Sequence, residues 1–240
     1  RRNLMTAYLF PVQCKTHADL VNYLCEEHLI THDEVKQAML RVDRKDFSRL
    51  NPYADAAQYI GYNCTISSPS MHAYALNELS TNLRAGMKAL DIGCGSGYLL
   101  AVMAYLVHKS GCVIGVEHMQ ELCSVARKNM KKHHKKLLQT KRVQIVHYDG
   151  RHGYLYGAPY DCINVGAATR LSTVHVLLEQ LNENGKLVAP VIVNEESNAQ
   201  IMRVYSKHEN GRVSVRDLVH VKFVPLTDEK TQRHTQMTFD

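Results

Sequence analysis

The chain has 240 residues, of which 45% are hydrophobic and 22% charged, and its formal net charge is +6 at neutral pH. This is the composition of an ordinary globular protein that is long enough to bury a core as one domain. No apolar run approaches the roughly 18 to 20 residues that a bilayer-spanning helix needs, which excludes that class of membrane protein. We expect residues 1–14 to form an N-terminal extension without a signal-peptide core and residues 15–240 to form a single domain.

The N-terminal part predicts helices that lie outside any sheet. Apolar residues recur at helical spacing from Thr16 to Leu29, with Thr16 as a candidate N-cap. A second helical pattern follows Asp33 and Glu34, which are acids suited to a first helical turn. These helices either pack over one edge of the sheet or form part of a substrate groove.

A polar segment that we predict to be irregular runs from Asn51 to Ser70 and is interrupted by Pro52, Gly61 and Pro69. It contains too many apolar and aromatic residues for a disordered segment, so the sequence predicts an ordered loop near the functional site. A helix from Met71 to Leu83 follows it.

The central motif is a glycine-rich turn between a strand and a helix. An apolar run reaches Asp91, three alternating glycines follow at Gly93, Gly95 and Gly97, and a helical pattern then extends to Leu106. Glycine is needed where the backbone takes positive φ or approaches a ligand, and the start of a helix offers free N–H groups. The G-x-G-x-G spacing differs from the G-x-G-x-x-G of dinucleotide-binding proteins and resembles motif I of S-adenosylmethionine-dependent methyltransferases. The turn alone would also fit a simple strand-to-helix connection.

Two further predicted strands end in acids. Cys112 to His118 predicts a buried strand with Glu117 near its end, 24 residues after Gly93, where a carboxylate can accept both hydroxyls of a ribose. A later strand runs into Asp149 and Gly150, a position that approaches the adenine in methyltransferases. Each acid alone would be a surface residue at the end of a strand, but their order and spacing together support a cofactor site.

The C-terminal part completes an alternation of strands and helices. Tyr160 to Ala168 predicts a buried strand, Ser172 to Leu181 a helix, and Lys186 to Val193 a fifth strand. Gln200 to Lys207 and Val213 to Val224 predict an antiparallel hairpin. The predicted fold class is therefore α/β, a doubly wound, mostly parallel, Rossmann-like sheet with a C-terminal antiparallel hairpin and N-terminal helices.

Cysteine and histidine usage bears on compartment and metal binding. The seven cysteines include no C-x-x-C pair, which favours a reducing compartment, and we expect a cytoplasmic protein. The adjacent His133 and His134 cannot both bind one metal ion from the face of a helix, and we expect no metal site.

Positive charge is concentrated between the second and third predicted strands. This basic segment is either a footprint for nucleic acid or a solvated helix end and loop. We favour the solvated surface, because the segment has no aromatic residues that could stack on bases. Its basic residues are Lys128, Lys131, Lys132, His133, His134, Lys135, Lys136, Lys141 and Arg142.

Several segments closely resemble the protein-L-isoaspartate (D-aspartate) O-methyltransferase family, over about residues 18–232. The Thr-Ile-Ser-x-Pro segment and the Pro-Leu-Thr-Asp tail are peculiar to that family. The matching segments are Asn51-Pro52-Tyr53, Thr65-Ile66-Ser67-Ser68-Pro69, Met71 to Leu76, Ala158 to Asp161, Val165 to Ala168 and Val224 to Asp228.

The resemblance implies that residues 15–240 are a methyltransferase domain. It implies transfer of a methyl group from S-adenosyl-L-methionine to the free α-carboxylate of L-isoaspartyl and D-aspartyl residues in damaged proteins, which initiates their repair. The implied partners are isoaspartyl-containing proteins and peptides, with no membrane and no nucleic acid, and the implied state is a monomer. A carboxylate of ordinary pKa is ionised at neutral pH, so this reaction needs positioning more than a general base.

Matched position by position, the resemblance implies the site residues. Ser67 matches the active-site serine, and we assign it to orienting the reactants, because the sequence shows no Ser-His-Asp arrangement that would activate it. The implied cofactor pocket consists of Cys64, Thr65, Ile66, Ser67, His72, Asp91, Gly93, Gly95, Ser96, Glu117, Asp149, Gly150, Thr227 and Gln232.

Departures from the family's usual residues fall where the peptide substrate is expected. Ser70 and Asn164 stand where histidine is usual, Thr169 and Arg170 where Ala-Pro is usual, and Ile192 where glycine is usual. The alternative reading is therefore a catalytically weak relative that binds the cofactor and acts as a protein-interaction module. A methyltransferase acting on nucleic acid or a small molecule is a third reading, supported chiefly by the basic segment.

Overall fold

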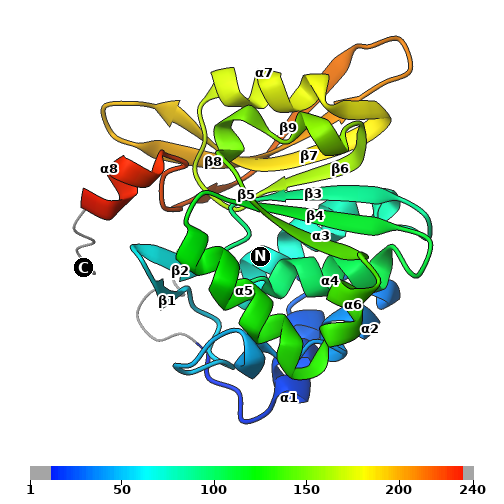
Figure 1. Cartoon of the computed structure of the whole chain (residues 1–240), viewed down its shortest axis with the longest axis vertical. Coiled ribbons are helices and arrows are strands. Elements are labelled where there is room, and N and C mark those ends of the chain that lie inside the picture. Colours follow the sequence, from blue (N-terminus) through cyan, green and yellow to red (C-terminus); the bar gives the residue numbers. More distant parts are fainter. Residues whose placement is uncertain (1–11, 235–240) are drawn as a thin grey trace.

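A seven-stranded sheet organises residues 12–234, the part of the chain that the computed structural model describes (Figure 1). Its strands lie in the order β5-β4-β3-β6-β7-β8-β9. Neighbours from β5 to β7 pair parallel, whereas β8 is antiparallel to both β7 and β9. The predicted fold class is confirmed, including the C-terminal hairpin. The strands are β3 (Lys88–Ile92), β4 (Cys112–Glu117), β5 (Val143–His147), β6 (Tyr160–Val165), β7 (Leu181–Asn194), β8 (Ala199–Lys207) and β9 (Val213–Val221).

Helices cover both faces of the sheet. In Figure 1, α3, α4 and α5 lie below it and α7 lies above it. Helix α4 is buried on nearly every side, because it lies between the sheet and α2, and its sequence is accordingly apolar all round. The helices are α1 (His17–Glu26), α2 (Asp33–Leu40), α3 (Pro69–Leu79), α4 (Tyr98–Leu106), α5 (Gln120–His133), α6 (Lys135–Gln139), α7 (Leu171–Glu179) and α8 (Glu229–His234).

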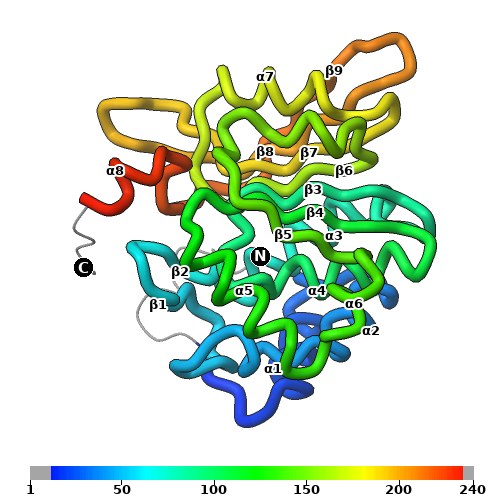
Figure 2. Tube along the Cα trace, viewed as in Figure 1, coloured from blue at the N-terminus to red at the C-terminus, as the bar shows by residue number. Residues whose placement is uncertain are grey.

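The N-terminal helices lie outside the sheet, as predicted, and pack on the helical layer (Figure 2). Thr16 caps α1 in a reciprocal arrangement: its hydroxyl accepts the N–H of Asp19 at 3.1 Å, and the Asp19 carboxylate accepts the N–H of Thr16 at 3.0 Å. The predicted N-cap is therefore confirmed. Residues 1–11 of the predicted extension lie outside the described residues.

The prediction of an irregular loop from Asn51 to Ser70 was wrong in part. The segment contains a separate two-stranded antiparallel sheet, β1 (Gln58–Gly61) and β2 (Cys64–Ile66). The turn between them places Gly61, Tyr62 and Asn63 at positive φ, a conformation that glycine and asparagine tolerate. Short strands flanking such a turn leave little periodicity to detect.

Several element ends also differ from the prediction. The fifth strand begins at Leu181, because residues 182–185 form a bulge in the pairing of β7 with β6. Helix α3 begins at Pro69 and ends at Leu79, where a 3-10 turn replaces the expected last turn. Helix α8 was not predicted, and Asp228 caps its start by accepting the Thr231 N–H at 2.7 Å.

Candidate active site

The site lies where the strand order reverses. From β3 the chain continues outward to β4 and β5 and then returns to β6, on the other side of β3. The connections that leave the carboxyl ends of the neighbouring strands go to opposite faces of the sheet at such a point and leave a crevice for a ligand. A hollow of about 510 Å³ opens there, lined by the end of β2, the first turn of α3, the glycine turn and the end of β6.

Three positive φ angles shape the glycine turn. Gly93, Gly95 and Gly97 have φ values of 73°, 45° and 84°. The Gly93 N–H donates to the Val116 carbonyl at 2.8 Å, and the Gly95 N–H donates to the Glu117 carboxylate at 3.1 Å. The turn is therefore fixed to the end of β4, which explains why the acid that ends β4 belongs to the same site.

Glu117 is a buried carboxylate at the rim of a second hollow of about 440 Å³. Burial raises its pKa, and the N–H groups of Met119 and Gly95, which donate to its two oxygens, oppose that rise only in part. The two hollows share Thr65, Gly93 and Gly166 in their linings and so adjoin. Together they form a single bent pocket.

Asp91 is a second buried acid, at the end of β3 in the larger hollow. It accepts a hydrogen bond from the Asn164 side-chain amide at 2.7 Å and forms no ion pair within the described residues. Burial raises its pKa to about 7, the Asn164 hydrogen bond opposes the rise, and the charge of Glu117 adds to it. A carboxylate held in this way is ready to receive a cationic ligand group.

Ser67 and His72 also line the larger hollow. The Ser67 carbonyl accepts a hydrogen bond from Arg44 at 2.7 Å, and the nearest nitrogen of Arg44 lies 3.3 Å from Nδ1 of His72. Within residues 12–234, no hydrogen bond links the Ser67 hydroxyl to a histidine. Such a hydrogen bond is what would activate a serine as a nucleophile.

Most of the predicted cofactor residues come together. Asp149 and Thr227 line neither hollow. The larger hollow is lined by Thr65, Ile66, Ser67, His72, Asp91, Gly93, Gly95 and Ser96, and the smaller one by Cys64, Thr65, Gly93, Glu117, Gly150 and Gln232. Asp149 instead binds Arg151 at 2.7 Å. Partial burial raises the pKa of Asp149, but the hydrogen bonds from Arg151 outweigh this effect and lower the pKa below its usual value.

Asn164 and Arg44 were missing from the predicted set. The sequence marks Asn164 only as a departure at the end of β6, and a polar residue at the carboxyl end of a buried strand was the available signal. Arg44 precedes the site by more than twenty positions in an unremarkable charged stretch, and no sequence signal indicates its contacts.

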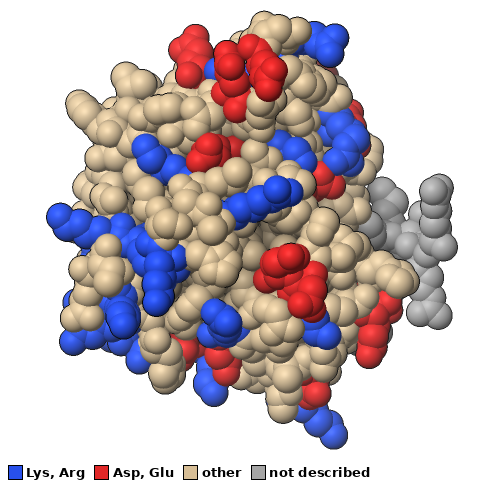
Figure 3. All heavy atoms as spheres, turned by 90° about the vertical axis from the view of Figure 1, so that its right-hand side faces the viewer, with Lys and Arg blue, Asp and Glu red and all other residues tan. Residues whose placement is uncertain are grey.

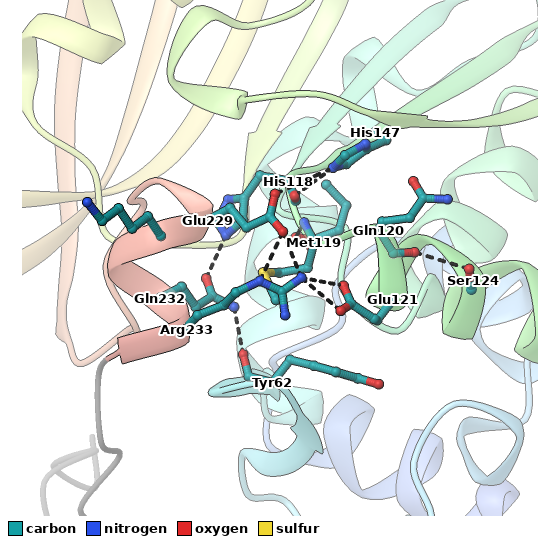
Figure 4. A network of polar contacts seen from close by, with 12 residues as sticks. Tyr62, His118, Met119, Gln120, Glu121, Ser124, His147, Glu229, Gln232 and Arg233 are labelled. Atoms are coloured by element: carbon teal, nitrogen blue, oxygen red, sulfur yellow. Dashed lines mark hydrogen bonds and ion pairs between the residues drawn. The ribbon is translucent and has the colours of Figure 1, made fainter.

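The C-terminal tail closes the smaller hollow (Figure 4). The Gln232 side chain donates to the Tyr62 carbonyl at 2.7 Å and accepts from the His118 ring at 2.8 Å. The next residue, Arg233, binds the Glu121 carboxylate at 2.8 Å and the Glu229 carboxylate at 2.7 Å. Helix α8 is therefore attached to both the β1–β2 turn and the start of α5.

We expect Arg233→Ala to weaken binding of S-adenosylhomocysteine about two- to tenfold, because solvent-exposed ion pairs are individually weak but the one with Glu121 joins α8 to α5. Isothermal titration calorimetry measures the change. Arg203→Ala is the matched control, since it removes a similar ion pair with Asp217 from the β8–β9 hairpin. Unchanged affinity in Arg233→Ala would show that the tail does not contribute to the pocket.

The departures noted in the sequence are not all surface residues, because Ser70, Asn164 and Thr169 are buried. The Ser70 N–H donates to Asp55 at 2.8 Å. Ile192 extends β7 by donating to the Thr169 carbonyl at 2.9 Å, and Arg170 forms an exposed ion pair with Glu195 at 3.0 Å. The hydrogen bond between Ile192 and Thr169 joins backbone groups and does not depend on the side chains, so these departures change side-chain size and, at Arg170, add a charge.

The basic segment lies on α5 and α6, away from both hollows. In Figure 3, which shows the molecule turned by 90° from Figure 1, lysine and arginine side chains gather on the left. Lys128, Lys131 and Lys135 are exposed, whereas His133 binds Asp46 at 2.6 Å and His134 is buried. In the described part of the chain, no group of three potential ligands could hold a metal ion, and no helix is long and apolar enough to cross a membrane.

The pocket fits S-adenosylmethionine. Two buried acids, Asp91 and Glu117, line the pocket of a ligand that would carry an ammonium group and ribose hydroxyls, and no cation between residues 12 and 234 pairs with Asp91. The glycine turn leaves space that a side chain would fill, since a Cβ on Gly95 would lie 3.2 Å from Ile60. A doubly wound sheet with this site defines an S-adenosylmethionine-dependent methyltransferase.

Comparisons with known proteins narrow the class to a family. The family model described as Protein-L-isoaspartate(D-aspartate) O-methyltransferase matches residues 15–231. The chain is 41% identical to a protein-L-isoaspartate O-methyltransferase of Caenorhabditis elegans, over 90% of this chain and 95% of the relative. It is 38% identical to protein-L-isoaspartate O-methyltransferase 1 of Arabidopsis thaliana, over 95% of this chain and 98% of the relative.

A solved structure agrees with this result. A protein-L-isoaspartate O-methyltransferase structure from Plasmodium falciparum, in complex with S-adenosyl-L-homocysteine, superposes with a TM-score of 0.81 at 33% identity. The match covers 89% of this chain and 99% of that one. The chain belongs to the protein-L-isoaspartate(D-aspartate) O-methyltransferase family.

Proposed function

We propose that the chain transfers the methyl group of S-adenosyl-L-methionine to the free α-carboxylate of L-isoaspartyl and D-aspartyl residues in damaged proteins, as its family does. The observation that carries the proposal is that Ser67 lines the same hollow as Asp91 and Gly95. A residue with a hydroxyl group therefore lines the same hollow as the acid and the glycine turn that would hold the cofactor.

The residues present suit this reaction. Asp91 would hold the amino group of the cofactor and Glu117 its ribose, while Gly150 and Gln232 line the hollow left for the adenine. When bound, S-adenosylmethionine supplies a methyl group on a positively charged sulfur. The carboxylate acceptor is ionised at neutral pH, so the Ser67 hydroxyl needs only to donate a hydrogen bond and fix its direction. Ile66, Met202 and Phe223 make part of the wall apolar, which limits access of water.

We expect Ser67→Ala to lower kcat about 10- to 100-fold while S-adenosylhomocysteine binds within about threefold of the wild-type affinity, because misplacing a reacting group affects the rate more than cofactor binding. The assay is methyl transfer from labelled S-adenosylmethionine to an isoaspartyl peptide, with its aspartyl twin as control. An unchanged rate would remove Ser67 from the reaction.

The same assay separates the candidate functions. Selective, base-labile labelling of the isoaspartyl peptide by the wild-type chain is the expected result. Cofactor binding without labelling would favour a catalytically weak relative that acts as an interaction module. The departures from the family's usual residues at Thr169, Arg170 and Ile192 are the feature that keeps this second candidate open.

We also propose that residues 15–240 form one domain that acts as a monomer in the cytoplasm on isoaspartyl proteins and peptides, without nucleic acid. Seven free cysteines, several of them buried, are consistent with a reducing compartment. Size-exclusion chromatography with light scattering tests the oligomeric state.

A further inference from the structure

Arg44 is a fully buried cation next to the site. It begins a short 3-10 turn after α2, and its side chain is 0% exposed. Taking a charge out of water is costly, so a buried arginine is normally paired with a carboxylate. Burial lowers the pKa of Arg44 to about 10, which still leaves the group charged at neutral pH.

No carboxylate in the described part of the chain forms an ion pair with Arg44. The acids around it have other partners: Asp43 binds Lys45 at 3.1 Å, Asp46 binds His133 at 2.6 Å, and Asp55 accepts the backbone N–H at the start of α3. The charge of Asp55 reaches Arg44 only through space. An ordinary structural ion pair therefore does not explain the burial of this arginine.

The guanidinium instead contacts three groups at the site. Its Nη2 donates to the Ser67 carbonyl at 2.7 Å, its Nη1 lies 3.3 Å from Nδ1 of His72, and its carbon lies 5.5 Å from the centre of the Tyr98 ring. Two of these residues, Ser67 and His72, line the larger hollow, whereas Arg44 itself does not. The guanidinium group thus contacts both of these lining residues from outside the hollow.

The contact with His72 also selects its protonation state. A guanidinium can only donate, so Nδ1 of His72 must accept, and the ring then carries its hydrogen on Nε2. Burial, and after it the charge of Arg44, lowers the pKa of His72 well below its usual value. The ring therefore stays neutral in a single tautomer.

We propose that Arg44 is a positioning residue for methyl transfer: it fixes the peptide after Ser67 and the ring of His72 so that the wall receiving the carboxylate is preformed. This inference rests on the proposed function. Preformed geometry matters because a small misplacement of reacting groups can cost about 100-fold in rate.

The test is a double-mutant cycle. Arg44→Met keeps the approximate length of the side chain but removes every donor, and we expect kcat/KM for an isoaspartyl peptide to fall about 30-fold. If Arg44 acts through Ser67, the double variant with Ser67→Ala will lose little more than the worse single variant, although the two changes in melting temperature add. Rate losses that multiply would overturn the inference, because a general loss of stability affects each variant independently.

Arg142→Met is the matched control. Arg142 also donates to two backbone carbonyls, those of Ala104 and His108, but it lies at the start of β5, at the opposite end of the sheet from the site. We expect it to lower the melting temperature and leave kcat/KM unchanged. An equal loss of kcat/KM in both variants would show that Arg44 has only a structural role.

Arg44→Lys keeps the test decisive if Arg44→Met fails to fold. An ammonium group can reach the Ser67 carbonyl or His72 but lacks the planar fork that reaches both. We expect it to bind S-adenosylhomocysteine and to retain about one tenth of the wild-type kcat/KM. Full activity would overturn the inference, since charge alone would then suffice. A wild-type chain that does not methylate the peptide would overturn the proposed function, and this inference with it.

Discussion

Gly95→Val is expected to abolish binding of S-adenosylhomocysteine, with no heat detected by titration calorimetry at concentrations that saturate the wild-type protein. Gly95 has a φ of 45°, where a β-branched residue is strained, and its added Cβ would lie 3.2 Å from Ile60 and 3.7 Å from Cys64. The two γ-methyl groups would extend further into the turn. Any shift of the turn also breaks the hydrogen bond from Gly95 to Glu117, so one substitution disturbs both ends of the pocket.

Gly211→Val separates this effect from simple backbone strain. Gly211 has a φ of 74° in the β8–β9 turn, and no atom lies within 4 Å of an added Cβ. We expect this variant to be destabilised by about 1 kcal/mol or more and to bind S-adenosylhomocysteine normally. Near-normal affinity in Gly95→Val would show that the glycine turn is not part of the cofactor pocket.

The parts of the site that could be predicted are those encoded locally. A strand followed by a glycine turn and a helix needs only about fifteen consecutive residues, and its hydrophobic pattern and glycines are visible in the sequence. Glu117 was found because the length of a βαβ unit limits where the next acid can fall. The structure brings Asp91, Gly95 and Glu117 together as this reasoning requires.

The remaining parts depend on contacts between distant segments. Arg44 reaches Ser67 and His72 only because α2 packs against α3, and Gln232 reaches Tyr62 only because the tail folds back on the β1–β2 turn. No periodicity records such contacts. The family resemblance supplied Gln232 but not Arg44, and it supplied Asp149 and Thr227, which line neither hollow.

The buried carboxylate of Asp91 is expected to destabilise the ligand-free protein at neutral pH. Its carboxylate is buried with one amide partner, and burial raises its pKa from about 3.9 to about 7. Between these values the folded protein holds a proton that the unfolded chain has released. The free energy of unfolding of the ligand-free protein therefore decreases as the pH rises from about 4 to 7, and the loss of about 4 kcal/mol from this group is complete above pH 7.

We expect Asp91→Asn to remove this cost. The new amide oxygen can still accept the hydrogen bond from Asn164, so urea unfolding at pH 8 should show a ligand-free protein that is about 2–4 kcal/mol more stable than wild type, with little difference at pH 4. The same variant should bind S-adenosylmethionine about 10- to 150-fold more weakly, because it loses a charge-assisted interaction of about 1.5–3 kcal/mol. This single substitution is thus expected to raise the free energy of unfolding and to lower the affinity for S-adenosylmethionine.

Asp217→Asn provides the control, because Asp217 is an exposed carboxylate on β9 whose removal should change neither the pH dependence nor the affinity appreciably. If Asp91→Asn is less stable than wild type at pH 8, the carboxylate has a structural cation that the hydrogen-bond pattern does not reveal. If it is more stable but binds S-adenosylmethionine as tightly as before, Asp91 does not hold the amino group, and Glu117 is then the only acid lining the pocket that remains for the cofactor. Gain of stability together with loss of affinity is the single outcome that assigns the burial of Asp91 to binding.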